Sequence, residues 1–126
     1  MKRLIPTAIL LILLVSVCII GNKQVIKMCE ETNKDIKKCY QAYENGDYSL
    51  AVEVASTIEN HWRNKEGRLA FFVNHGMLDD ISVSVSRLAA YTPDTMDFHF
   101  ALECIDIKTV LLRMCDEQKL LIENFY

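Results

Sequence analysis

The chain of 126 residues carries 14 Lys and Arg against 17 Asp and Glu, and 51% of its residues are hydrophobic. Without Lys2 and Arg3, the part beyond residue 22 keeps 12 basic residues against the same 17 acidic ones, a net charge of −5. Such a body lacks the basic surface that phosphate contacts require, which excludes nucleic-acid binding. With four glycines and two prolines, the chain is not of the disordered or low-complexity kind, and its length suits one small core.

The chain begins with a basic head that contains Lys2 and Arg3, and an apolar segment, Leu4 to Ile20, follows it. This segment ends in Val17-Cys18-Ile19-Ile20-Gly21, which offers no Ala-x-Ala triplet for signal cleavage. The bulky neighbours of Cys18 also do not suit a lipidated cysteine. A cleaved signal peptide and a lipoprotein signal are therefore the weaker alternatives, and an uncleaved anchor is favoured.

The length of the segment agrees with an anchor. As a helix, residues 4–20 would span about 25 Å, slightly less than the roughly 30 Å of a hydrocarbon core. Flanking Lys and Arg side chains can reach across this difference. We expect an uncleaved signal-anchor over residues 1–22, with residues 4–20 in the lipid bilayer, and one helical domain over residues 23–126.

The orientation of this anchor depends on two opposing signals. The basic head, Lys2 and Arg3, favours a cytoplasmic N-terminus, whereas several lysines follow the segment closely: Lys23, Lys27, Lys34, Lys37 and Lys38. A long following domain crosses the membrane largely regardless of its charge, and a basic head is typical of an export signal. We therefore expect a cell-membrane protein with its N-terminus in the cytoplasm and its body outside.

Apolar residues at steps of three and four predict the first two helices of the body. The first runs from about Val25 to Glu44, can continue directly from the anchor, and ends at Asn45-Gly46. Asp47 can cap the second helix. The apolar stripe of the second helix comprises Ala51, Val54, Ala55, Ile58, Trp62, Leu69, Phe72 and Val73. Gly67 lies within this stripe and leaves a break there open.

Two further helices are expected after a turn at Asn74-His75-Gly76. Residues 78–89 fit a helix, although alternation over residues 81–86 also fits a strand; a lone strand would leave its backbone unpaired, so a helix is favoured. Thr92-Pro93 predicts the start of a last helix from Pro93 to Asn124. Its broad apolar face comprises Phe98, Ala101, Leu102, Ile105, Leu111, Leu112, Cys115 and Ile122. The predicted fold class is all-α: a single-pass transmembrane helix followed by an antiparallel bundle of about four helices.

Four of the five cysteines lie outside the anchor: Cys29, Cys39, Cys104 and Cys115. If the first and last helices of the body are antiparallel, Cys39 faces Cys104 and Cys29 faces Cys115, because the two pairs have similar axial separations of about 15 and 16.5 Å. An even number of cysteines in an exported domain permits two disulfides. The alternative is four free thiols that pack as small apolar residues.

The segments Ile58-Glu59-Asn60-His61-Trp62 and Phe72-Val73-Asn74-His75-Gly76-Met77-Leu78-Asp79-Asp80-Ile81 carry a resemblance to a known family. The chain resembles an uncharacterised domain-of-unknown-function family of small membrane-anchored helical proteins from spore-forming Gram-positive bacteria. The shared features are the short anchor, a Trp after an acidic-Asn pair, and a His-x-x-Leu-Asp step before an amphipathic helix. The resemblance implies an anchored helical body and a membrane partner, but no activity.

No set of residues in the sequence supports catalysis or metal binding. His61 and His75 would lie about 21 Å apart on one helix, too far to share an ion, and His99 is elsewhere. No Ser-His-Asp order, phosphate loop or nucleophile elbow is present. We therefore expect no catalytic residue, no metal and no cofactor, and hence a protein that is not an enzyme.

The candidate residues of an interaction surface are Trp62, His75 and Asp79, although Trp62 on an apolar stripe also suits a core. The expected function is that of a membrane-anchored extracytoplasmic interaction module, as an accessory subunit of a larger membrane protein. A cell-envelope sensor that binds a small ligand between helices is the alternative.

Overall fold

The computed structural model describes residues 2–125, and nearly all of this range is helical. The elements follow in the order α1 (Leu4–Glu44), α2 (Tyr48–Leu69), α3 (His75–Ala90), the 3-10 helix η1 (Pro93–Thr95) and α4 (Phe98–Phe125). α1 contacts α2 and α4, and α3 contacts the same two helices, so the four α-helices surround one core. The predicted all-α fold class is confirmed.

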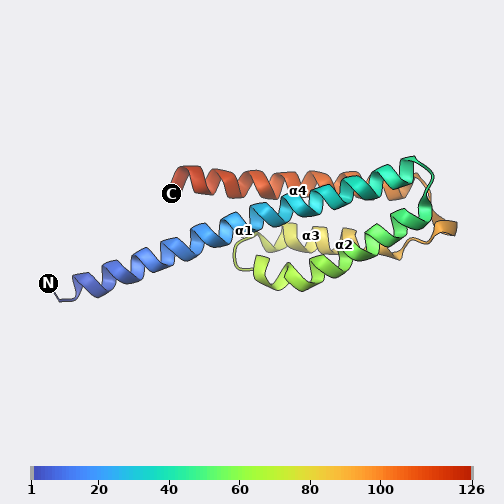
Figure 1. Ribbon diagram of the computed structural model, residues 1–126. Helices are drawn as coiled ribbons and strands as arrows, with labels where there is room; N and C mark the ends of the chain where they lie inside the picture. Colours follow the sequence, from blue (N-terminus) through green and yellow to red (C-terminus); the bar gives the residue numbers. More distant parts are fainter. Residues whose placement is uncertain (1, 126) are drawn as a thin grey trace.

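α1 is a single helix of 41 residues, so the apolar segment and the first helix of the body are continuous (Figure 1). Its first half projects from the body, and its second half buries apolar residues at helical spacing, namely Val25, Cys29, Ile36 and Cys39. The helix ends as expected before Gly46, whose φ of 78° is the left-handed conformation that glycine adopts without strain.

α2 begins and continues as the sequence predicts, but it ends earlier. Asp47 caps it, since its Oδ1 accepts a hydrogen bond of 3.2 Å from the backbone N–H of Leu50. The helix passes through Gly67 without a break. Phe72 and Val73, predicted on the helical stripe, lie instead in the turn before α3. In this turn the Phe72 ring contacts α1 at Gly21.

α3 is a helix throughout, so the strand alternative over residues 81–86 is wrong. Asn74 caps it, with Oδ1 accepting a hydrogen bond of 2.7 Å from the backbone N–H of Gly76. The alternating Ser residues do not prevent a helix, because one of them, Ser82, donates to the carbonyl of Leu78 one turn earlier, at 2.9 Å.

The predicted start of the last helix at Pro93 is wrong, because α4 begins at Phe98. Thr92 and Thr95 form a capping box that closes η1 as a separate short turn. The extended Met96 (φ −66°, ψ 127°) then interrupts the helix. Asp97 provides a new start, with its Oδ1 accepting from the backbone N–H of His99 at 2.9 Å.

The contacts along α1 show how its neighbours are arranged. Toward α2, Cys39 Sγ donates to the carbonyl of Ala51 at 3.3 Å, and Glu31 pairs with Lys65 at 3.9 Å. Toward α4, Cys39 contacts Cys104, and Glu30 pairs with Lys119 at 3.8 Å. The order of contacts along α2 and α4 therefore reverses the order along α1, and the end of α4 returns toward the apolar segment (Figure 1).

Candidate functional site

Within the described range, α1 is the helix that is long and apolar enough to cross a membrane. Its apolar side chains before Gly21 are largely uncovered by the body: Leu4 is 70% exposed and Val15 39%. The hydroxyls of this segment bond within the helix, since Thr7 donates to the carbonyl of Arg3 and Ser16 to that of Ile12, each at 2.8 Å. Such bonding leaves no hydroxyl of this segment unpaired in an apolar surrounding.

The four cysteines of the body lie together in the pairs expected from the sequence. Cys39 and Cys104 are 0% and 1% exposed, and their thiols are in hydrogen-bonding contact. Cys29 is close to Cys115 at the other end of the α1–α4 contact. All four are free thiols in this structure. The two disulfides stay a prediction.

The protonation of these thiols determines their chemistry. Burial raises the pKa of Cys29 to about 12, and the neighbouring Cys115 and Glu30 add to the shift. The hydrogen bond with Cys39, followed by burial, raises the pKa of Cys104. Because the thiolate is the reactive form of cysteine, thiols that keep their protons at neutral pH are poor nucleophiles. All four cysteines of the body are part of the hydrophobic core.

The predicted interaction residues do not form one surface. Trp62 is 1% exposed, and its indole N–H donates to Ser82 Oγ at 2.8 Å. It therefore belongs to the core, where a buried indole needs such an acceptor. His75 and Asp79, in contrast, are exposed on the first two turns of α3.

α4 carries an exposed apolar stripe that the sequence placed in the core. The stripe consists of Phe98, Leu102, Ile105 and Leu112, which are 61%, 47%, 48% and 47% exposed. The buried face is different and comprises Phe100, Cys104, Ile107, Leu111 and Met114. Of the broad face predicted for this helix, only Leu111 and Cys115 are buried. We refer below to the four exposed residues as the α4 stripe.

A cavity of about 250 Å³ opens between α1 and α4 beside this stripe. It is lined by Ile36, Lys37, Tyr40, Cys104, Ile105 and Lys108. Its floor is apolar and its rim carries two lysines, so it could hold a small, partly apolar ligand.

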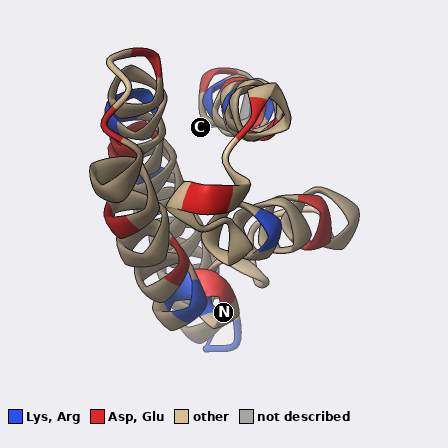
Figure 2. Cartoon of the chain, turned by 90° about the vertical axis from the view of Figure 1, so that its right-hand side faces the viewer, with Lys and Arg blue, Asp and Glu red and all other residues tan. Residues whose placement is uncertain are grey.

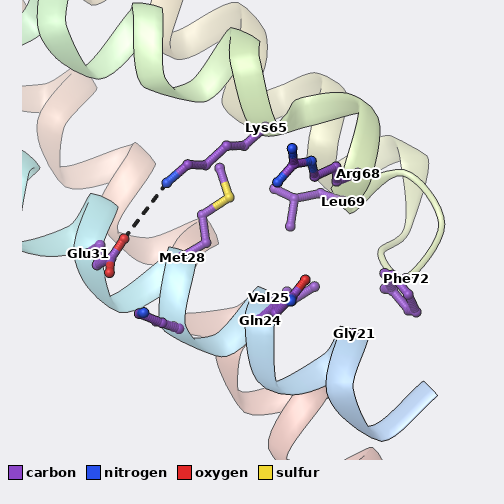
Figure 3. A pocket seen from close by; sticks show the side chains of 10 residues that line it. Gly21, Gln24, Val25, Met28, Glu31, Lys65, Arg68, Leu69 and Phe72 are labelled. Carbon is purple, nitrogen blue, oxygen red and sulfur yellow. Dashed lines mark ion pairs between the residues drawn. The ribbon is translucent and has the colours of Figure 1, made fainter. Parts of the chain in front are cut away.

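A larger cavity, of about 330 Å³, lies between α1 and α2 where the apolar segment of α1 ends. We call it the foot pocket; it is lined by Gly21, Gln24, Val25, Lys27, Met28, Glu31, Lys65, Arg68, Leu69 and Phe72. Figure 3 shows Lys65 reaching from α2 toward Glu31 on α1, with Arg68 beside it and Phe72 next to Gly21. Basic side chains thus border an apolar floor.

The turn between α2 and α3 is fixed against α1 and α4 at one end of this pocket. Gly21 allows the Phe72 ring to lie directly against α1, because a Cβ at that position would overlap the ring and force it to move. On the other side, Gln118 Nε2 of α4 donates to the carbonyl of Phe72 at 3.1 Å. The neighbouring Phe71 is 85% exposed. Nothing in the sequence indicated this role for Phe72, which was predicted to lie on the apolar stripe of the second helix.

Within residues 2–125 no group of three or more His, Cys, Asp or Glu side chains could hold a metal ion. His99 instead contacts Asp97, with 3.2 Å between Nδ1 and Oδ1. Acidic and basic residues are mixed along the helices in the end-on view of Figure 2 rather than gathered on one face.

The fold and its surfaces define a small all-helical domain on a long N-terminal helix whose first half is apolar and exposed. Residues 19–125 match the family described as Domain of unknown function (DUF4363), and the chain belongs to this family. The expected membership of a domain-of-unknown-function family is thereby confirmed. No curated protein and no solved structure matches the chain. The family description names no function.

Proposed function

We propose that this protein is a single-pass membrane protein whose helical body acts as an interaction module, as an accessory subunit of a larger membrane protein. Residues 4–20 cross the bilayer, the N-terminus is cytoplasmic, and residues 23–126 form an antiparallel bundle outside. The observation that carries the proposal is the α4 stripe. Exposed apolar residues that gather on one face of a helix are typical of sites where another protein binds.

The direction of the stripe supports a partner in the same membrane. α4 packs along α1, and α1 continues from the apolar segment, so the stripe stands upright on the bilayer. From Phe98 to Leu112 it rises about 21 Å. Its members are spaced by four, three and seven residues, the spacing that a partner helix lying in a groove would match. A protein embedded beside α1 can extend such a helix or groove outward along the stripe.

Site-specific photo-cross-linking tests this interaction. A photoreactive residue is placed at Leu102, at Leu112, and at the control position Glu53, which is exposed on α2. After illumination of intact membranes, we expect the same membrane protein to be cross-linked from both stripe positions and not from the control. Equal cross-linking at all three positions would contradict a specific binding face.

Labelling of intact cells tests the orientation. Asp94→Cys lies on the exposed η1 turn, whereas Lys2→Cys lies before the apolar segment, and the native body cysteines are buried. A membrane-impermeant maleimide should label Asp94→Cys directly and Lys2→Cys only after permeabilisation. The reverse pattern would place the body in the cytoplasm.

A second candidate function, a cell-envelope sensor, is favoured by the cavity between α1 and α4. Its volume of about 250 Å³ lies just below the size range of about 300–1,000 Å³ for small-molecule pockets. A ligand that raises the melting temperature of the purified full-length protein, with no other protein present, would support this function. Ile36→Trp, which fills the cavity, should abolish that shift.

A further inference from the structure

The foot pocket lies at the height of lipid headgroups if α1 crosses the bilayer. The apolar segment ends at Ile20, and the pocket begins at the next residue, Gly21. The headgroup layer on each side of the hydrocarbon core is about 5–7 Å thick, which corresponds to roughly four residues of helix. Gly21, Gln24 and Val25, on the α1 wall of the pocket, therefore lie within or directly above this layer.

The charges of the foot pocket differ from those of the rest of the body. Lys27, Lys65 and Arg68 line it against the single acid Glu31, whereas the body as a whole is acidic. Lys65 is paired with Glu31 at 3.9 Å. Among the described residues, Lys27 and Arg68 form no ion pair, so two cations are available to an anion that enters from the membrane side.

The other walls of the pocket match the apolar part of a lipid. Val25, Met28 and Leu69 form its floor, and Phe72 closes one side (Figure 3). A phospholipid headgroup carries its phosphate directly above the glycerol and acyl chains. The basic side chains of the pocket therefore suit the phosphate, and its apolar floor suits the glycerol and acyl chains. A free anion would contact only the basic side chains.

Phe71 supplies an independent indication of contact with the membrane. At 85% it is the most exposed of the large apolar side chains whose burial is described. The turn that carries Phe71 is held by the contact of Phe72 with Gly21 and by the hydrogen bond from Gln118. Phe71 therefore lies near the end of the apolar segment that adjoins the body. An aromatic ring that would be costly in water is favourable at the membrane interface.

We propose that the foot pocket binds the phosphate headgroup of an anionic phospholipid in the adjoining leaflet, with Phe71 inserted into the membrane interface. Lys27 and Arg68 bind the phosphate, and the floor of the pocket covers the glycerol end of the acyl chains. This inference rests on the membrane anchor of the proposed function. It adds a second attachment, which fixes the tilt of the body relative to the bilayer.

Lipid titration of the full-length protein in detergent micelles tests the pocket. Native mass spectrometry counts bound phosphatidylglycerol for the wild type, for K27Q/R68Q, and for the matched control K38Q/R63Q, whose charges lie on the same two helices outside the pocket. Removal of two basic residues beside an anionic headgroup should weaken binding by roughly thirtyfold. The control should bind as the wild type does.

Three results would overturn the inference. K27Q/R68Q could retain phosphatidylglycerol at the wild-type level. Phosphatidylcholine could bind as well as phosphatidylglycerol, which would remove the role of the charge. Inorganic phosphate could displace the lipid at equal concentration, which would show a site for the free anion rather than for the lipid.

Fluorescence tests the insertion of Phe71. Phe71→Trp is compared with Leu50→Trp, which is exposed at the opposite end of α2, in vesicles that contain brominated lipid. We expect quenching at position 71 and none at position 50, after subtraction of the signal from buried Trp62. Equal quenching at both positions would overturn the insertion.

Flotation distinguishes a failure of this inference from a failure of the anchor. If the full-length wild type does not float with neutral vesicles, the membrane anchor fails and this inference fails with it. If it floats, and K27Q/R68Q floats equally but retains phosphatidylglycerol as the wild type does, only the headgroup site fails.

Discussion

The two apolar faces of α4 have similar residues but different surroundings. Phe100, Cys104, Ile107, Leu111 and Met114 are at most 1% exposed, whereas Phe98, Leu102, Ile105 and Leu112 are at least 47% exposed. Both faces follow helical spacing, and one is offset from the other by two residues. Since a helix turns about 100° per residue, an offset of two residues places them on nearly opposite sides.

The difference shows that apolar spacing identifies a helix but does not decide which of its faces is buried. The buried face contacts α1 and α3 because those helices are brought there by the turns of the chain. The other face is left largely uncovered by both helices, although Ile105 at its edge lines the cavity between α1 and α4. If this uncovered face binds another molecule, as proposed, its substitutions should affect binding more than stability, whereas those on the buried face should affect stability first.

The largest difference in the free energy of unfolding is expected when a charge is introduced on each face of α4 in turn. Ile107→Asp places a carboxylate on a residue that is 1% exposed, with no cation available in the core. It should lower the free energy of unfolding by about 4 kcal/mol or more. Ile105→Asp, on a side chain that is 48% exposed, should lower it by about 0.5 kcal/mol or less.

Chemical denaturation of the full-length variants in detergent, followed by circular dichroism, measures both values. Similar losses for Ile105→Asp and Ile107→Asp would mean that the α4 stripe is covered within the chain, and the comparison of the two faces would be invalid.

A second, smaller effect is expected at alkaline pH. The buried face of α4 meets Cys29 and Cys39 of α1, and the pKa of Cys29 is raised from 9.0 to about 12 in the folded state. The unfolded chain therefore releases this proton at lower pH than the folded chain does. The stabilisation is complete below about pH 9 and is lost as the pH rises from there toward 12.

Denaturation of the reduced protein at pH 8, 9.5 and 10.5 tests this dependence. C29A/C104A should lose less stability over this range than the wild type, because it lacks two of the three thiols whose pKa is raised. Cys18→Ala, in the apolar segment, is the control and should follow the wild type. Parallel curves for all three proteins would show that the thiols are not the cause.

The polar end of the buried face gives a third, more local effect. Gln118 is 3% exposed and donates to the carbonyl of Phe72. Gln118→Leu keeps the volume but leaves that carbonyl without its partner, which should cost about 1–2 kcal/mol. Hydrogen exchange should increase in the turn between α2 and α3, and the exposed control Glu117→Ala should leave it unchanged. Unaltered exchange in Gln118→Leu would show that Gly21 alone holds the turn.

The sequence was sufficient for the features that depend on nearby residues. The continuity of α1 follows from the absence of a strong breaker near Asn22, and the turn at Gly46 and the cap at Asp47 depend on local backbone geometry. The cysteine pairs were also predictable, because the spacing along two reversed helices fixes which thiols meet. Helical periodicity and the reversal of chain direction at each short turn between helices are enough to predict these features.

The sequence was insufficient where two signals compete or where distant segments meet. α4 begins five residues later than Pro93 because a capping box and Asp97 together define a new start. The broad apolar face of this helix could not be divided without the positions of α1 and α3. The foot pocket combines α1, the end of α2 and the following turn, and Gln118 reaches that turn from α4, so no single stretch of sequence indicates it.

The smallest effect on stability, and the most direct test of function, is expected at Leu112, which is compared with its buried neighbour Leu111. Leu111 is 1% exposed and Leu112 is 47% exposed. Leu111→Ser should lower the free energy of unfolding by about 3 kcal/mol or more, because it removes buried apolar volume and adds a hydroxyl to the core. Leu112→Ser should change it by about 0.5 kcal/mol or less.

If the α4 stripe binds a membrane partner, Leu112→Ser should reduce the amount of that partner that co-purifies while leaving the fold intact. L102S/L112S should reduce it further, because both substitutions remove apolar contacts from the same face. Quantitative recovery of the partner with the folded double variant would show that the stripe is not the binding face. A fall in the stability of Leu112→Ser by more than about 1 kcal/mol would instead mean that the residue already has a partner within the chain.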